Sequence, residues 1–250
     1  MAAATAVSGD RKNWGEAFSA MRLLLSDPRD TVQVFRVMKA LNGGTAQRNY
    51  HRLLRTPEGG YVAYKREELV GKLTNREWLL QFAPGTVGAA YRAFLERTGF
   101  SADGLEAVSK EVERDDRDEQ TPYAWMGRRE RDVHDIWHTL TGYRADDPLG
   151  ELCLVAFSYA QSKGLGWAFI AMMGSLKSLR EPHSGAVLRA VWEGYRNGRN
   201  AHWLHGEDID ALFAEPLDAA RKRLNIPHPV AYERAQELVG EARTWLAAQA

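Results

Sequence analysis

Apolar residues recur at helical spacing along most of this chain. Val34, Val37, Met38 and Leu41, for example, follow one another at intervals of three or four positions or as direct neighbours. This spacing gathers apolar side chains on one face of an α-helix. The sequence offers no convincing alternation of apolar and polar residues, which would indicate β-strands. The pattern therefore predicts an all-α fold, built as a single multi-helix domain.

Proline, glycine and capping residues place the boundaries of these helices. Helices are predicted at 13–26, 30–41, 45–55, 75–82, 86–98 and 121–142, then from 148, from 164, and at 184–197, 208–224 and 230–248. Between the helices 45–55 and 75–82, residues 57–60 are predicted as a turn, and residues 61–64 give a minor indication of a short strand. We expect a disordered N-terminus over 1–12 and one helical domain over 13–250. The charged run 110–119 is predicted as a surface loop rather than a domain boundary.

The composition is that of an ordinary folded protein with balanced charge. Lys and Arg equal Asp and Glu, at 33 each, which argues against a nucleic-acid binder that works by bulk electrostatics. Cys153 is the one cysteine, so an intrachain disulfide and a Cys-rich zinc site are excluded. We expect this thiol to be a buried small hydrophobe. The least charged stretch, 152–176, is predicted to form two buried helices rather than a membrane-inserting hairpin.

A candidate metal site is centred on His134 and His138, four residues apart in the predicted helix 121–142. That spacing puts both imidazoles on one helix face, where they can chelate a divalent metal. Glu151, in the first turn of the next helix, can supply an oxygen ligand. Asp135 can bind the metal from the edge of the helix face that carries the histidines, or it can orient a histidine without binding the metal itself. Two histidines with one or two carboxylates leave room for water or substrate, as catalytic zinc sites do.

The alternative interpretation is that the two histidines share a helix face by chance and are surface or core residues. An apolar stripe beside them places them at the border of a core and favours a metal site; it consists of Val133, Trp137 and Leu140. Arg131 lies three residues before His134. It can either hold an anionic substrate group or pair with a nearby acid such as Asp135.

Two further polar groups have simpler interpretations than a binding site. The first consists of His202, His205, Glu207 and Asp208. The second consists of Arg48, Arg52 and Arg55 with His51. A second metal at the first group is less economical than a helix N-terminus capped by Asp208. For the second group, a solvated face is favoured over contact with anionic lipid headgroups.

The residues around the two histidines resemble the Coq4 family of coenzyme Q (ubiquinone) biosynthesis proteins. The resemblance rests on the segment RDVHDIWHTL, at 131–140, followed by Gly142 and by Leu149-Gly150-Glu151. Motifs at 84–95 and at 192–227 recur in the family's order, so the similarity covers about 15–235. Carried over by position, the family's metal ligands are His134, Asp135, His138 and Glu151, and zinc is the usual metal.

One departure from the family pattern concerns the spacing before Glu151. Twelve residues, 139–150, separate His138 from Glu151, where the family usually has eleven. The extra residue falls at 144–147, in a predicted loop that can absorb an insertion. Ligation by Glu151 therefore remains part of the prediction.

The resemblance implies oxidative decarboxylation of a polyprenylated hydroxybenzoate-type precursor, in which hydroxyl replaces the ring carboxyl. Arg131, Asp135 and Glu151 are the expected catalytic residues, with Arg131 holding the carboxylate and an acid moving a proton. Two alternatives stay open. One is a non-catalytic scaffold of the same family. The other is a zinc hydrolase of the HExxH type, which is disfavoured because Asp135 is shorter than the glutamate base of that motif.

The expected surroundings of the site follow from the same resemblance. It implies partnership with other ubiquinone-biosynthesis proteins and a cytoplasmic protein held peripherally at the inner membrane; a homo-oligomer is left open, and no nucleic acid is expected. A hydrophobic lipid channel leading to the metal would be lined by Phe157, Trp167, Phe169, Ile170, Met172 and Met173. Filling an ordinary core is the alternative role for most of these side chains.

Overall fold

A computed structural model describes residues 12–28, 30–99 and 121–247 of the chain. Within these ranges every regular element is a helix, and one isolated β-bridge joins Thr86 to Pro216. The predicted all-α fold is confirmed. The expected disorder of 1–12 falls almost wholly outside the described residues, and the charged run 110–119 lies outside them as well.

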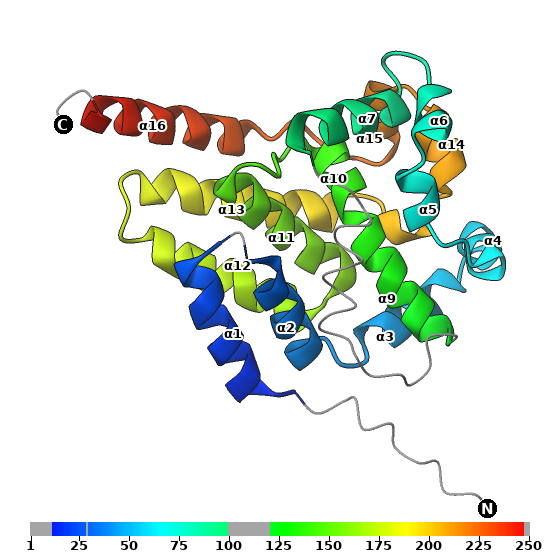
Figure 1. The fold of residues 1–250 in the computed structure, drawn as a ribbon, viewed down its shortest axis with the longest axis horizontal. Helices are drawn as coiled ribbons and strands as arrows, with labels where there is room; N and C mark the ends of the chain where they lie inside the picture. The colour runs from blue at the N-terminus through cyan, green and yellow to red at the C-terminus, as the bar shows by residue number, and fades with distance from the viewer. Residues whose placement is uncertain (1–11, 29, 100–120, 248–250) are drawn as a thin grey trace, which may run out of the picture.

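The helices follow one another through the chain as labelled in Figure 1. They are α1 (Trp14–Ser26), α2 (Thr31–Leu41), α3 (Thr45–Leu53), α4 (Pro57–Lys65), α5 (Val70–Leu73), α6 (Arg76–Leu80), α7 (Val87–Thr98), α9 (Pro122–Asp132), α10 (His134–Thr141), α11 (Pro148–Ser162), α12 (Leu165–Ser178), α13 (Ser184–Asn200), the 3₁₀ turn η1 (Leu204–Gly206), α14 (Ile209–Ala214), α15 (Leu217–Arg223) and α16 (Val230–Ala247).

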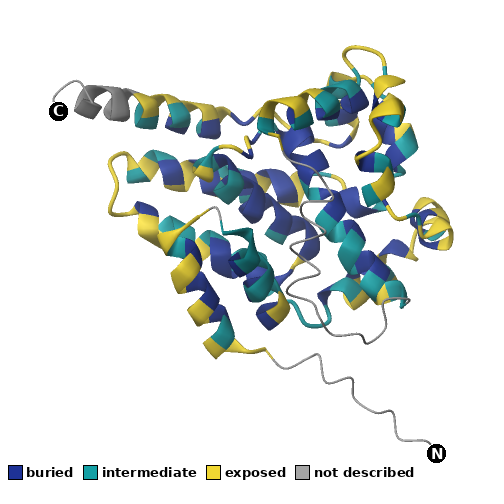
Figure 2. Cartoon of the chain, in the orientation of Figure 1, coloured by how far each residue is buried: buried dark blue, intermediate teal, exposed yellow. Residues whose placement is uncertain are grey.

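The centre of the molecule is the pair α11 and α13, which share the most extensive helix–helix contact. Two glycines of α13 allow this close approach. A Cβ at Gly194 would lie 2.5 Å from the Cys153 carbonyl oxygen, and one at Gly198 would lie 2.6 Å from that of Phe157. Both α11 residues are fully buried, as predicted for Cys153. Figure 2 shows buried residues gathered along these two helices.

Three hydrophobic clusters surround this pair. The main cluster joins α7, α10, α11, α13, α14 and α15. A second cluster joins α1 and α2 to α12, and a third lies beneath α3, α4 and α9. The candidate metal site therefore lies on a helix, α10, that is itself embedded in the main core.

The segment 57–65 corrects two expectations. The predicted turn at 57–60 and short strand at 61–64 are together the helix α4. Thr56 caps it by accepting a hydrogen bond from the Gly59 N–H at 3.1 Å, and Pro57 occupies the first helical position. Both are standard helix starts. The two adjacent glycines, Gly59 and Gly60, favoured a turn in the sequence, but capping and burial of Val62 and Ala63 outweigh them.

Two predicted helices are each divided in the structure. The helix expected at 121–142 breaks at Val133, whose ψ of −8° departs from the helical value of about −42°. The helix expected at 208–224 breaks at Glu215 and Pro216, and there the chain pairs with 85–87 instead. The Val87 N–H donates to the Glu215 carbonyl, and the Leu217 N–H donates to that of Gly85, both at 2.9 Å.

The low-charge stretch forms two helices, α11 and α12, separated at Lys163, which adopts a left-handed conformation. No helix in the described part of the chain is long and apolar enough to cross a membrane. The two helices differ in burial. Most of α11 is inside the protein, whereas Met172, Leu176 and Leu179, in and just after α12, are between 51% and 53% exposed. The expectation of two buried helices is thus confirmed for α11 and only in part for α12.

Candidate metal centre

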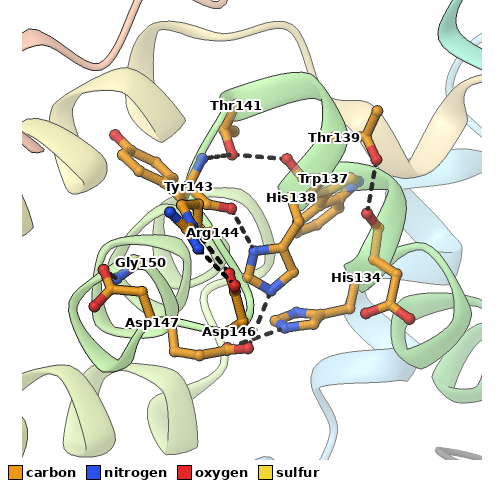
Figure 3. Close-up of polar contacts among 12 residues, drawn as sticks. His134, Trp137, His138, Thr139, Thr141, Tyr143, Arg144, Asp146, Asp147 and Gly150 are labelled. Atoms are coloured by element: carbon orange, nitrogen blue, oxygen red, sulfur yellow. Dashed lines mark hydrogen bonds and ion pairs between the residues drawn. The ribbon is translucent and has the colours of Figure 1, made fainter. Parts of the chain in front are cut away.

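The helix α10 turns His134 and His138 toward one point. Their ring centroids are 4.9 Å apart and the rings are perpendicular (Figure 3). The Nδ1–H of His138 donates to the Tyr143 carbonyl at 2.8 Å. Because a carbonyl only accepts, this bond places the proton on Nδ1 and leaves the Nε2 lone pair available for a metal. The Trp167 ring stacks on His134 at 5.7 Å, and Phe94 stacks on His138 at 5.9 Å.

Glu151 reaches the two imidazoles from the first turn of α11. Its Oε1 lies 3.3 Å from Nε2 of His138, and its Oε2 lies 3.7 Å from Nε2 of His134. These three residues offer ligand atoms that all lie within 4.8 Å of one another. Two ligands of a tetrahedral metal, each at about 2.1 Å, would be about 3.4 Å apart. The separations of 3.3 Å and 3.7 Å from Glu151 to the two imidazoles are close to this spacing, and the donor types are those a divalent metal takes.

Burial supports the same fit. The Nε2 atom of His138 is buried and forms no hydrogen bond with a described residue, although the Glu151 carboxylate faces it at 3.3 Å. A buried nitrogen without a hydrogen bond is costly. A metal ion would satisfy it. The Glu151 side chain keeps 40% of its exposed surface, so solvent or substrate can reach the centre. An accessible side is typical of catalytic rather than structural metal sites.

The electrostatics tie the three groups together. Burial by itself raises the pKa of Glu151, but His138 and His134 outweigh it and hold that pKa well below its ordinary value. Burial likewise lowers the pKa of His138, and the nearby Glu151 carboxylate reverses this, so the net shift is upward. Two imidazoles and a carboxylate thus favour positive charge at His138, the place where a divalent cation would replace a proton.

Asp135 lies beside the three converging residues rather than among them. It is 4% exposed, and its Oδ2 has no hydrogen-bond partner among the described residues. Burial raises its pKa, and the two histidines oppose that shift. This placement suits a residue outside the ligand set better than an edge ligand. The fully buried Tyr91 hydroxyl from α7 also has no hydrogen-bond partner among the described residues. Burial, and after it the charge of Asp135, raises the pKa of Tyr91.

Arg131 is separated from the histidines by the break at Val133. Its Nε donates to the Asp132 carboxylate at 2.7 Å, and its side chain is 8% exposed. It pairs with an acid, as the sequence allowed, but with Asp132 rather than Asp135. A role for Arg131 in holding a substrate carboxylate stays a prediction.

The loop 144–147, where the sequence predicts an extra residue, is held by several hydrogen bonds. The Oδ2 atom of Asp147 accepts hydrogen bonds from the Gly150 N–H, the Tyr232 hydroxyl and the Gln236 amide, at 3.0 to 3.1 Å. A Cβ at Gly150 would lie 2.1 Å from the Arg144 carbonyl oxygen, so only glycine lets the loop fold against α11. Glu151, at the start of α11, faces both histidines, and the extra residue relative to the family stays a prediction.

Some residues that surround the two histidines could not be identified from the sequence. Tyr143 acts through its backbone carbonyl, which gives no sequence signal. Tyr91 and Phe94 belong to a motif that the family resemblance included, but their contact with α10 could not be seen in it. Of the six side chains proposed for a lipid channel, Trp167 stacks on His134, while Phe157 lies in the main core and Met172 is 53% exposed. The channel stays a prediction.

The second polar group near 202–208 is explained by structure rather than by a metal. Asp208 caps α14, accepting from the N–H groups of Asp210 and Ala211, as predicted. Glu207 pairs with Arg223 at 2.7 Å. His205 is 1% exposed and faces Glu130 at 3.9 Å. Among the described residues, the group at His134, His138 and Glu151 is the one cluster of three or more metal-binding side chains.

The fold and the site together define an all-helical protein with a candidate metal centre of two histidines and one glutamate. The chain belongs to the coenzyme Q (ubiquinone) biosynthesis protein Coq4 family, whose model matches residues 13–230. The resemblance seen in the sequence is confirmed.

Relatives from several organisms share this family. The chain is 28% identical over 197 residues to the ubiquinone biosynthesis protein coq4, mitochondrial, of Pyrenophora tritici-repentis, covering 77% of this chain and 63% of that one. It is 29% identical over 145 residues to the mitochondrial COQ4 homolog of Nematostella vectensis, covering 57% and 66%. The chain thus spans less than two thirds of the length of these relatives.

A solved structure shows the same fold. It is a crystal structure from Nostoc punctiforme PCC 73102, of a protein provisionally assigned to ubiquinone biosynthesis. The two chains superpose with a TM-score of 0.64 at 22% identity, covering 86% of this chain and 99% of the other. At that level of identity the likeness concerns the fold alone.

Proposed function

We propose that this protein binds a divalent metal through His134, His138 and Glu151 and acts in ubiquinone biosynthesis. Its substrate would be a polyprenylated hydroxybenzoate-type precursor, and its reaction an oxidative decarboxylation. In that reaction the ring carboxyl leaves as carbon dioxide and an oxygen-atom donor supplies the hydroxyl that replaces it. The observation that carries the proposal is the convergence of three ligand atoms within 4.8 Å around a buried, unsatisfied imidazole nitrogen.

The donor set suits zinc, which takes histidine nitrogen and carboxylate oxygen in catalytic sites. The same two-histidine, one-carboxylate set is also used by iron(II) in oxygenases, and metal analysis decides between them. When bound, the ion would supply Lewis-acid polarisation of a substrate oxygen.

The chain's own residues would position the substrate and move its protons. The Tyr143 carbonyl fixes the His138 tautomer. Asp135, whose pKa is raised by burial, is placed to hold a proton close to the centre. The Tyr91 hydroxyl, buried within electrostatic range of Asp135, would orient that carboxyl. Trp167 would form a flat wall beside the ring of the substrate.

A prenylated substrate needs an apolar surface near the site. The exposed side chains of Met172, Leu176 and Leu179 repeat at helical spacing along one side of α12 and its end, and α12 also carries Trp167. We therefore propose that the prenyl tail follows this strip and that the strip meets the membrane surface that holds the quinone. This corresponds to a protein peripherally associated with a membrane.

The test is metal content and quinone synthesis in matched histidine variants. His138→Ala should abolish stoichiometric metal, measured by elemental analysis, and should cause a carboxylated polyprenyl precursor to accumulate in a deletion strain. His228→Ala is the control, because His228 is 67% exposed and pairs only with Glu233 in the described structure. Retention of metal or of normal quinone levels in His138→Ala would contradict the proposal.

A non-catalytic scaffold that binds polyprenyl lipid and other quinone-biosynthesis enzymes is the alternative. The exposed apolar strip on α12 would serve that role equally well. A scaffold predicts that His138→Ala, once shown to be folded, still supports quinone synthesis and partner assembly. An enzyme predicts that assembly persists while the carboxylated precursor accumulates.

A further inference from the structure

The outer side of α3 and α4 carries an unusual combination of exposed aromatic and basic side chains. Tyr64 is 87% exposed, Tyr61 is 52% exposed and Leu54 is 48% exposed. Arg55 and Arg66 are exposed next to them. We call these five residues the basic tyrosine face.

A hollow lies within this face. It is lined by Tyr50, Leu54, Gly60, Ala63, Tyr64 and Arg66 and has a volume of about 410 Å³. Its aromatic floor continues below, where the ring of Tyr50 packs edge-on against Tyr123 and Trp125. The hollow is thus supported by the third hydrophobic cluster, and it is open to solvent with both polar and apolar lining residues.

The charge of this region is one-sided. Residues 45–66 contain five Lys and Arg residues and a single acid, Glu58. The two acids that follow, Glu67 and Glu68, pair with Lys72 and Arg128. Arg52 is stacked on the Trp203 ring at 4.5 Å. Burial, and after it the charge of Arg55, lowers the pKa of Arg52, so these guanidinium groups repel each other. Neither Arg55 nor Arg66 forms an ion pair with a described residue. An anionic group placed here would relieve the repulsion.

We propose that the basic tyrosine face docks an acidic segment of another protein, whose carboxylates pair with Arg55 and Arg66 and whose apolar or aromatic side chain enters the hollow. Tyrosine and arginine are the residue types that dominate protein–protein hot spots. The exposed tyrosines and leucine beside two unpaired arginines favour a peptide over nucleic acid or lipid, because a peptide supplies carboxylates and apolar side chains together.

The position of the face separates it from the strip proposed for the membrane. In Figure 1, α4 lies at the opposite side of the molecule from α1 and α12. Docking here would therefore leave α12 and the metal centre free. The proposal does not depend on the metal chemistry, so the two can fail separately.

The experiment is site-specific photo-cross-linking in the cells that naturally contain the protein. Tyr64→p-benzoyl-phenylalanine places the cross-linker at the rim of the hollow, and Trp192→p-benzoyl-phenylalanine, 60% exposed on α13, is the matched position elsewhere. The cross-linked peptide is sequenced, synthesised and titrated against the full chain. Arg55→Glu with Arg66→Glu tests the face, and Arg189→Glu with Arg196→Glu makes the same charge change on exposed arginines of α13.

We expect the Tyr64 cross-link to fall on an acidic segment of another protein that contains an apolar residue. The double change at Arg55 and Arg66 should weaken binding of the synthetic peptide at least about tenfold, while the control pair changes binding little and both variants keep the helical content of the natural chain. A cross-link to lipid, to nucleic acid, to this same chain or to a segment without acidic residues would overturn the proposal. So would the absence of a cross-link, or equal weakening by the two charge reversals.

Discussion

Two contacts between histidine and glutamate, one at α10 and one at α9, have opposite electrostatics. At the candidate metal centre, Glu151 holds a depressed pKa and His138 a raised one, so the pair favours its charged form. One turn earlier, burial raises the pKa of Glu130 to about 7. Burial, with the charges of Arg129 and Arg52, lowers the pKa of His205 to about 3. This second pair favours its neutral form.

Distance and the number of nearby imidazoles explain the difference. Glu151 lies 3.3 Å and 3.7 Å from two imidazoles and is 40% exposed. Glu130 faces a single imidazole at 3.9 Å, its side chain is 15% exposed, and the Asn49 amide occupies its Oε1. At the proposed metal centre two imidazoles thus converge at short range on one accessible carboxylate, whereas the second contact joins a single imidazole to a carboxylate. The comparison can be tested by changing one pair at a time.

The largest expected effect is the loss of metal binding on changing Glu151. Glu151→Gln removes the charged oxygen ligand, so metal affinity, measured by competition with a chelator, should fall by more than the roughly 10–100-fold typical of residues outside the ligand set. Glu130→Gln is the matched control and should leave metal affinity unchanged. An equal loss in both variants would show that the two pairs form one site.

A smaller effect is expected in stability as a function of pH. The folded pKa of Glu130, about 7, lies above its ordinary value of 4.5. Below pH 4.5 Glu130 is protonated in both the folded and the unfolded state, and the free energy of unfolding is unaffected by its titration. As the pH rises from 4.5 through 7 the unfolded state loses this proton first, so the free energy of unfolding falls by up to about 3 kcal/mol. The free energy of unfolding of Glu130→Gln minus that of the natural chain should rise over this interval and then level off.

Denaturant titrations at several pH values measure this difference. Glu237→Gln is the control, since Glu237 is 61% exposed and pairs with Arg234 on the surface. Its difference curve should be flat. A flat curve for Glu130→Gln would mean that Glu130 is ionised at neutral pH like Glu151, and the contrast between the two pairs would disappear.

Asp135→Asn should have a moderate effect on the metal centre. A carboxylate outside the ligand set typically contributes about 10–100-fold to metal affinity or activity, and Asp135 is positioned in this way. Chelator competition with the variant measures the loss. A loss as large as that of Glu151→Gln would instead make Asp135 a direct ligand.

The smallest effect is expected for Tyr91→Phe. The hydroxyl has no hydrogen-bond partner among the described residues, so its removal should change the free energy of unfolding by less than about 1 kcal/mol. Metal content should be unchanged, and a fall in turnover with unchanged metal would support the role of the hydroxyl in orienting Asp135. A large loss of stability would indicate a hydrogen bond through Tyr91 that the fold depends on.

The sequence by itself determined most of the helices and the residues that converge. Periodicity and capping located α1, α2, α11 and α16 to within a few residues, because helix starts and stops are set by local chemistry. The spacing of His134 and His138 fixed their common face, since four residues complete about one helical turn. The family pattern added Glu151, which local reasoning could only suggest.

The tertiary structure decided what depends on contacts distant in sequence. The breaks at Val133 and Pro216 separate Arg131 from the histidines and divide the helix expected at 208–224, where the chain pairs with 85–87. The meeting of Glu130 with His205, 75 positions away in the chain, has no local signal. Whether a histidine and a glutamate become a charged pair or a neutral one depends on burial and on neighbouring charges, and these exist only once the helices have packed.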